Sequence, residues 1–321
     1  MLFFVFRTKR LFFLLHIYIN SEKGEAAMDI DLVFSGGGVK GFALLGAYEA
    51  IEEKGLRWKR LAGTSAGALL AALLAAGYTA REMTQLFEEL RLEQFLDERA
   101  SWVPFSVWKW VRLYWHLGVY KGNVFEQWIE SALAARGVRM FRDVPADSLY
   151  IVASDVTNGR IVVLPDDLAI YGIDPGSFSI AKAVRMSTSI PYFFEPVRLH
   201  GRDGTSLIVD GGVLSNFPLF LFDEEKETKK RPVLGVQLSA KPGQRPKRRI
   251  ANALDLYEAL FEAMKEAHDA RYISRRHEKN IIFLPVENVL ATDFSIDLEA
   301  RRRLIDYGRE RARQFLQRWA F

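Results

Sequence analysis

Three glycine-containing turns follow apolar, strand-like runs of this chain, and they limit the folds that it can adopt. The turns are segments 36–41 (GGGVKG), 63–67 (GTSAG) and 210–212 (DGG). Glycine is required where a chain turns sharply or where its backbone approaches another group closely, because it has no Cβ. The fold must therefore place three tight turns directly after strands, and the residues in those turns indicate a reactive site.

Segment 63–67 has the pattern of a nucleophile elbow, the sharp turn that exposes a reactive serine between a strand and a helix. Its central residue is Ser65, and the residues around it lack bulky Cβ groups: Gly63, Ala66 and Gly67. An apolar helix is expected over 66–76. Its N-terminal dipole and amides would favour an anionic intermediate beside the serine. A plain helix cap needs no such glycines, so we interpret Ser65 as a nucleophile.

Segment 36–41 lies between a predicted strand, Ile30–Phe34, and a predicted helix, Phe42–Glu53. Backbone N–H groups in a glycine-rich turn of this kind point towards a bound group. Donors aimed at a developing oxyanion contribute about 3 kcal/mol each. The sequence therefore predicts an oxyanion hole formed by Gly36, Gly37, Gly38, Gly41 and, from the elbow, Ala66.

The same G-x-G-x-x-G spacing also occurs in dinucleotide-binding loops, which makes a nucleotide-binding oxidoreductase an alternative. Such a loop is followed by an acidic, ribose-binding residue about 20 positions on. This chain has Leu56, Arg57 and Trp58 in that region, and its next strand ends in the serine elbow. No Gly-Lys-Ser/Thr follows the loop, so a Walker loop is excluded as well.

Asp210 ends an apolar run, 206–209, and is followed by Gly211 and Gly212. An apolar strand would bring the carboxylate into a partly dry site, where burial raises its pKa and makes it a better base. An Asp-Gly-Gly segment alone more often marks an ordinary turn. Beside the other two motifs, we interpret Asp210 as the base that activates the serine.

Together these motifs resemble those of the patatin-like phospholipase family. Three further stretches also resemble it: 153–157 (ASDVT), 186–191 (MSTSIP) and 215–218 (SNFP). The resemblance implies a dyad of Ser65 and Asp210 that hydrolyses glycerolipids or simpler esters without a metal or other cofactor. It implies a lipid or ester substrate and no nucleic acid partner.

Two alternative functions stay open. A Ser-His-Asp esterase of the α/β-hydrolase type would need a late histidine on a loop after a strand. None of the histidines has this placement: His16, His116, His200, His268 and His277. A lipid-binding protein that has lost catalysis is the second alternative, and absent ester turnover would support it.

Strand-like runs alternate with helical segments, which predicts a three-layer α/β fold with a mainly parallel sheet flanked by helices on both faces. The predicted strands are Ile30–Phe34, Leu61–Gly63, Tyr150–Ser154, Ile161–Leu164, Ile208–Asp210, Val233–Leu238 and Ile281–Leu284. The third and fourth of these are expected to pair as a hairpin across the turn at 157–160.

We divide the chain into an N-terminal extension (1–28), the domain that contains the motifs (29–222) and a C-terminal extension (223–321). The C-terminal extension is expected to complete the fold. It contains a basic linker, 241–249, and a terminal helix over 298–321 with a solvated basic face.

The N-terminal extension contains apolar runs at Leu2–Phe6 and Leu11–Ile19. The longer run is too short to span a bilayer, which takes about 20 residues. Two explanations stay open: the segment lies on a membrane, or translation begins at Met28. We slightly prefer the second.

Five of the seven tryptophans lie between Trp102 and Trp128. Several apolar residues and one arginine recur there at helical spacing: Trp108, Val111, Arg112 and Trp115. Two explanations are equally open. The segment is an amphipathic cap of interface-seeking aromatic residues over the active site, or an insertion whose rings pack on the sheet.

Composition agrees with one well-packed core. A chain of 321 residues that is 49% hydrophobic can bury a single large core. The absence of cysteine is compatible with a reducing compartment, so we expect a cytoplasmic protein. The net charge of +4 suits an anionic membrane surface, so peripheral membrane contact is a further expectation. The sequence predicts no particular oligomeric state.

Overall fold

The computed structural model describes residues 28–97, 113–222, 231–239, 250–251, 256, 259–265, 278–286 and 289–319. Several predictions concern residues outside these ranges: the N-terminal runs, residues 102–112 of the tryptophan-rich segment, the basic linker, and His16, His268 and His277. Within the described ranges, no helix combines the length and the apolar character that a membrane crossing requires.

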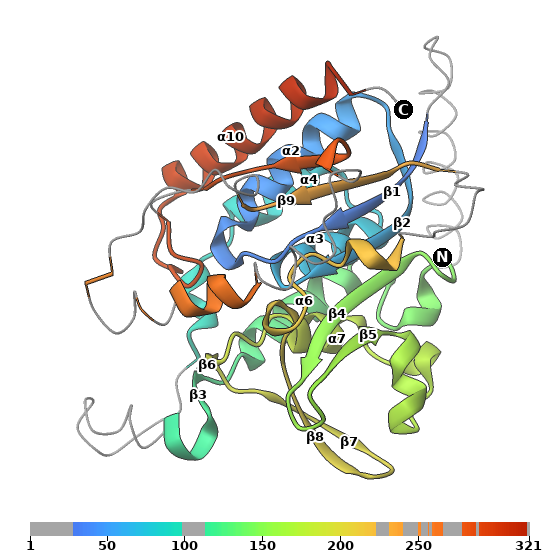
Figure 1. Ribbon diagram of the computed structural model, residues 1–321, viewed down its shortest axis with the longest axis vertical. Helices are drawn as coiled ribbons and strands as arrows, with labels where there is room; N and C mark the ends of the chain where they lie inside the picture. Colours follow the sequence, from blue (N-terminus) through green and yellow to red (C-terminus); the bar gives the residue numbers. More distant parts are fainter. Residues whose placement is uncertain are drawn as a thin grey trace, which may run out of the picture.

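An eight-stranded sheet forms the centre of the described structure (Figure 1). Its strand order is β10-β9-β1-β2-β4-β8-β7, with β5 paired to β4. The strands are β1 (Asp29–Phe34), β2 (Arg57–Thr64), β4 (Leu149–Asp155), β5 (Arg160–Leu164), β7 (Val197–Gly201), β8 (Gly204–Asp210), β9 (Val233–Gln237) and β10 (Ile281–Phe283). A separate two-stranded sheet joins β3 (Gly118–Tyr120) and β6 (Tyr192–Phe194).

The strands from β10 to β4 run parallel to their neighbours. By contrast, β5 and β8 run antiparallel to β4, and β7 runs antiparallel to β8. The predictions of an α/β fold with a mainly parallel sheet and of the hairpin between β4 and β5 are therefore confirmed. The direction of β8, the strand that ends in Asp210, was not part of that prediction.

Helices flank the sheet, and some of them connect its parallel strands. They are α2 (Phe42–Glu53), α3 (Ala66–Ala75), α4 (Ala80–Glu88), α6 (Asn123–Ala134), α7 (Ile180–Ser187) and α10 (Leu298–Leu316). Short 3-10 helices are η1 (Gly38–Gly41), η2 (Leu92–Phe95), η3 (Phe141–Asp143), η4 (Asp166–Tyr171), η5 (Pro175–Ser177), η6 (Gly211–Val213) and η7 (Leu219–Leu221). The helices predicted after the first two glycine turns are thus present as α2 and α3.

Two apolar clusters cover opposite faces of the sheet, because side chains alternate along each strand. On β1, Leu32 and Phe34 belong to the large cluster that includes α2 and α3, whereas Val33 belongs to the second cluster. The second cluster also includes three residues in or next to η7: Phe217, Leu219 and Phe222.

The C-terminal helix α10 packs along α2, and the backbones of the two helices approach each other closely (Figure 1). A Cβ placed on Gly46 of α2 would lie 1.8 Å from the carbonyl oxygen of Ile305. A Cβ on Gly308 of α10 would lie 1.9 Å from the carbonyl oxygen of Ala43. Because α2 begins directly after the turn at 36–41, α10 stabilises the helix that positions this turn.

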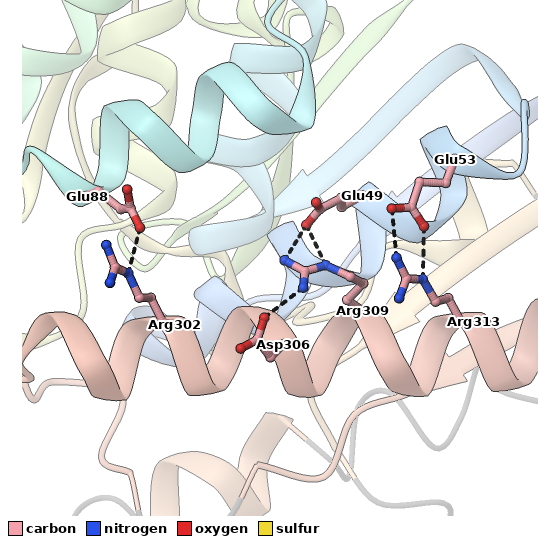
Figure 2. Close-up of polar contacts among 7 residues, drawn as sticks. All are labelled: Glu49, Glu53, Glu88, Arg302, Asp306, Arg309 and Arg313. Carbon is pink, nitrogen blue, oxygen red and sulfur yellow. Dashed lines mark hydrogen bonds and ion pairs between the residues drawn. The ribbon is translucent and has the colours of Figure 1, made fainter.

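Arginines of α10 also form ion pairs with glutamates of α2 and α4, as Figure 2 shows. The pairs, each with 2.8 Å between nitrogen and oxygen, are Arg309–Glu49, Arg313–Glu53 and Arg302–Glu88. The basic face of the helix is therefore paired in part rather than simply solvated. Partly exposed pairs of this kind contribute roughly 0–1 kcal/mol each, so the close glycine contact is the stronger constraint on α10.

Arg301 of α10 is buried, with 6% of its surface exposed. Its guanidinium donates hydrogen bonds to the carbonyl oxygens of Leu90 at 2.6 Å and Ile296 at 3.2 Å. Because Leu90 follows α4 and lines the cavity described below, α10 also holds one wall of that cavity in place.

We expect Gly308→Ala to destabilise the protein, although alanine is the better helix former by about 1 kcal/mol. The added Cβ would push α10 away from α2, and overpacking of this kind costs roughly 1–3 kcal/mol. Urea unfolding followed by circular dichroism measures the free energy of unfolding. Gly176→Ala is the matched control, since its Cβ would meet nothing closer than 3.6 Å. Equal stability of the two variants would contradict the proposed packing constraint.

Candidate active site

The register of three adjacent strands brings two of the glycine turns together. Strand β4 lies between β2 and β8. Thr64, the last residue of β2, pairs with Val152 of β4, and the next residue of β4, Ala153, pairs with Asp210 of β8. Ser65 directly follows Thr64, and Asp210 is the last residue of β8. The predicted nucleophile and the predicted base therefore lie at the same level of the sheet, on either side of β4.

Ser65 has a strained backbone, with φ 53° and ψ −121°. This is the left-handed region that side chains other than glycine rarely adopt, and such outliers occur at functional sites. The neighbouring glycines are sterically required. A Cβ on Gly63 would lie 2.3 Å from the carbonyl oxygen of Gly67, and one on Gly67 would lie 2.5 Å from that of Phe34. The turn therefore has the geometry of a nucleophile elbow.

A second serine holds this elbow in place. The backbone N–H of Ser65 donates a hydrogen bond of 2.9 Å to Oγ of Ser187, at the end of α7. The Ser187 hydroxyl in turn donates to the carbonyl oxygen of Val152 at 2.5 Å. Ser187 lies in a family-like stretch of the sequence, but the sequence predicts no role for it, because its partner lies 122 residues away along the chain.

Asp210 is buried beside the elbow, with 2% of its surface exposed. The N–H of Gly212 donates to its Oδ1 at 2.7 Å, and the Ser65 hydroxyl lies close enough to the carboxylate to interact with it. Burial raises the pKa of Asp210 above the usual aspartate value, whereas the positive charge of Lys265, the Ser65 hydroxyl and the Gly212 amide act in the opposite direction. Burial has the larger effect, so the carboxylate is a stronger base than an exposed aspartate.

The third glycine turn also depends on close packing. A Cβ on Gly211 would lie 2.2 Å from the carbonyl oxygen of Val152. The same carbonyl oxygen accepts the hydrogen bond of Ser187. Strand β4 therefore contacts both the base turn and the residue that holds the elbow.

The first glycine turn faces the elbow. A Cβ on Gly41 would lie 2.7 Å from Cβ of Ala66, so Gly41 permits this approach. Contrary to the prediction, the N–H of Gly36 donates a hydrogen bond to the carbonyl oxygen of Asn216 at 2.9 Å. Gly36 is therefore not a donor to an oxyanion here.

Of the four other residues predicted for the oxyanion hole, three besides Gly41 offer their amides to an incoming oxygen atom. In the part of the chain that the structure describes, no protein acceptor binds the amides of Gly37, Gly38 and Ala66. Gly38 has φ 56°, and its Cβ would lie 2.1 Å from the carbonyl oxygen of Ala291, so no other residue fits there.

An apolar cavity opens beside Ser65, with about 770 Å³ of empty space including its mouth. The polar side chains that line it are those of Ser65 and Thr188. Its aromatic lining consists of Phe42, Phe87, Phe95, Phe125, Trp128, Phe194 and Phe294. Its apolar walls suit a hydrocarbon chain.

Two tryptophans of the tryptophan-rich segment fall within the described residues, and their environments differ. Trp128 packs against Phe125 and Phe95 and lines the cavity, whereas Trp115 is 70% exposed. One ring therefore packs inside, and the other faces solvent. The choice between a cap and a packed insertion depends on residues 102–112, which lie outside the described ranges.

The described histidines lie apart from Ser65 and Asp210 in the hydrogen-bond network. His200 shares a hydrogen bond of 2.9 Å with Thr205 on the hairpin between β7 and β8. Neither His200 nor His116 hydrogen-bonds to Ser65 or Asp210. Among the described residues, no group of three or more acidic or histidine side chains is placed to hold a metal ion.

Comparisons with known proteins point in one direction. The sequence model of the patatin-like phospholipase family matches residues 32–223. "Uncharacterized protein YqhO" of Bacillus subtilis is 55% identical over 294 residues, which cover 92% of this chain and all of that protein. "Triacylglycerol lipase ptl3" of Schizosaccharomyces pombe is 27% identical over 192 residues, or 59% of this chain and 38% of the lipase.

Among solved structures, VipD from Legionella pneumophila is similar in fold. The TM-score is 0.55 at 19% sequence identity, and the match covers 92% of this chain and 68% of VipD. At this identity the likeness concerns the fold alone. It agrees with the α/β architecture described above.

We expect Ser187→Ala to destabilise the protein by about 1–3 kcal/mol, because it leaves the buried amide of Ser65 without an acceptor. Urea unfolding measures the loss. Ser131→Ala is the control: the Ser131 hydroxyl also binds a backbone carbonyl, that of Gln127, but on an exposed helix surface. That change should alter stability by no more than about 0.5 kcal/mol. If both variants lost the same stability, Ser187 would have no special role in holding the elbow.

Proposed function

The chain belongs to the patatin-like phospholipase family, and we propose that it is a serine acyl hydrolase that cleaves carboxylic esters of lipids. The observation that supports this most directly is the buried contact between Ser65 and Asp210 beside an apolar cavity. A nucleophile placed beside a base is the arrangement that covalent catalysis requires.

In the proposed reaction, the Ser65 oxygen attacks the ester carbonyl carbon while Asp210 accepts the serine proton. The negative oxygen of the tetrahedral intermediate binds the amides of Gly37, Gly38 and Ala66. Asp210 returns the proton to the departing alcohol, and the acyl group stays on Ser65. Water, deprotonated by Asp210, then releases the carboxylic acid and restores the serine.

The cavity supports a hydrocarbon chain as the acyl part of the substrate. Its walls are almost wholly apolar, and it begins at Ser65. Each methylene group that leaves water contributes about 0.8 kcal/mol to binding, so a long acyl chain should bind better than acetate. The named function of the yeast relative, a triacylglycerol lipase, agrees with a lipid ester as substrate.

Two alternatives make different predictions. A lipid-binding protein without catalysis would occupy the same cavity but would not react with an ester or a serine-directed probe. A Ser-His-Asp esterase would depend on a histidine, and His268 and His277 lie outside the described residues. The two experiments below separate these alternatives from the dyad.

We expect Ser65→Ala to abolish labelling by a fluorophosphonate probe and turnover of a panel of esters and phospholipids. The substitution removes only the attacking oxygen, so the circular dichroism spectrum should stay unchanged. Mass spectrometry of the labelled wild-type protein identifies the modified residue. Labelling of a different serine, or turnover by the folded variant, would refute the assignment of the nucleophile. A wild-type protein that binds lipid without labelling or turnover would favour the binding module.

We expect Asp210→Asn to lower kcat/KM by roughly 100- to 10,000-fold, because the amide cannot accept the serine proton. Steady-state kinetics on a soluble short-chain ester measures the loss. The comparison variants are His200→Gln, His268→Gln and His277→Gln, which should lose much less. A histidine variant as inactive as Asp210→Asn would favour the Ser-His-Asp mechanism.

A further inference from the structure

Lys265 is a buried cation that comes from outside the segment matched to the family. The family match ends at residue 223, and Lys265 belongs to the helical residues 259–265. Only 5% of its surface is exposed. A buried ammonium group loses its hydration, which is unfavourable unless other charges compensate. The position of Lys265 therefore requires an explanation.

The lysine lies against the turn that contains Asp210. A Cβ on Gly212 would lie 2.8 Å from Cε of Lys265 and 3.0 Å from Oδ1 of Asp210. The lysine stem and the carboxylate therefore approach the same side of Gly212. The N–H of Gly212 also binds that carboxylate at 2.7 Å, so the three groups form one compact cluster.

Two charged groups compensate Lys265. One is Glu262, one helical turn earlier, with 3.7 Å between Nζ and Oε1. The other is Asp210, whose carboxylate interacts electrostatically with Lys265. The Nζ of Lys265 also lies 4.4 Å from the ring centroid of Phe261. Glu262 keeps 20% of its side chain exposed, so water screens that pair more than the contact with the fully buried Asp210.

Other charges near Asp210 are directed elsewhere. Asp155, on the adjacent strand β4, accepts hydrogen bonds from Tyr171 at 2.8 Å and Asn158 at 2.7 Å. The remaining groups that act on the Asp210 carboxylate are neutral, namely the Ser65 hydroxyl and the Gly212 amide. Within the described residues, Lys265 is thus the charged side chain that acts on the base.

We propose that Lys265 is a positioning residue of the dyad, whose buried ammonium keeps Asp210 ionised and ready to accept the serine proton at neutral pH. This proposal rests on the proposed function, since it assigns a role within the same site. Lys265 acts through Asp210 and contacts neither substrate nor the reacting atoms.

The direction of the effect follows from electrostatics. Burial raises the pKa of Asp210, and the charge of Lys265 lowers it. An opposite charge within about 4–6 Å lowers a carboxyl pKa by roughly 1–3 units. Loss of the lysine charge therefore protonates Asp210 at a higher pH, and the acidic limb of the pH–rate profile moves upwards. Loss of the competing charge on Glu262 has the opposite effect.

The test compares the full chain with four variants. Lys265→Met removes the charge and keeps the length of the stem, and Lys265→Arg restores a charge. Glu262→Gln removes the competing carboxylate. Lys182→Met is the matched control, because Lys182 also lies over a phenylalanine ring, with 5.7 Å between Nζ and the Phe178 centroid, but is half-buried on α7. Circular dichroism checks that each variant is folded.

Two measurements follow the protonation of Asp210. One is the acidic limb of kcat/KM against pH on a soluble short-chain ester. The other is a titration of the Asp210 carboxyl carbon by NMR, assigned with Asp210→Asn, which needs no turnover. In Lys265→Met both midpoints should rise by roughly 1–3 pH units. They should fall in Glu262→Gln, return towards the wild-type value in Lys265→Arg, and stay unchanged in Lys182→Met.

Equal midpoints in Lys265→Met and in the Lys182→Met control would overturn the proposal, even if both enzymes were active. Failure of the proposed function has a different signature, since the wild-type protein would then show neither probe labelling nor turnover. In that case the NMR titration still decides whether Lys265 controls the ionisation of Asp210. If Lys265→Met does not fold, the test is Glu262→Gln: the midpoint of the Asp210 titration must fall in that variant if Lys265 acts on Asp210.

Discussion

The register of β2, β4 and β8 is the constraint on which the site depends. Thr64 and Asp210 pair with adjacent residues of β4, so a shift of either outer strand would separate the serine from the carboxylate. Backbone hydrogen bonds maintain this register, and alternate side chains of the strands are buried on opposite faces. The strained backbone at Ser65 persists because its surroundings fit only one conformation: two glycines permit the turn, and Ser187 binds its amide.

The C-terminal part of the chain connects the site to the rest of the fold. The segment matched to the family ends at residue 223, yet β9 pairs with β1, and α10 packs on α2. The contact between α10 and α2 depends on Gly46 and Gly308, since a Cβ on either would collide with backbone atoms. Residues beyond the matched segment thus stabilise the strand and the helix on either side of the first glycine turn.

Burial has two consequences for the same site. An apolar cavity suits a hydrocarbon chain, and burial beside the elbow raises the pKa of Asp210. A raised pKa makes the Asp210 carboxylate a stronger base, but only the ionised form can accept a proton. A nearby cation compensates without opening the site to water, so the apolar cavity and the buried Lys265 are complementary features.

The sequence alone determined seven of the eight strands of the main sheet, the first helices, the β4–β5 hairpin and the three turns, because these depend on glycine positions and on apolar runs within short windows. It also indicated Ser65 and Asp210 through the motifs that contain them. It missed β3, β6 and β7. Only the tertiary structure decided the direction of β8, the engagement of the Gly36 amide by Asn216, and the contacts of Ser187 and Lys265. These contacts join residues dozens to hundreds of positions apart, and no local pattern specifies them. They follow from the packing of the whole chain, which sets the distances between side chains and excludes water from them.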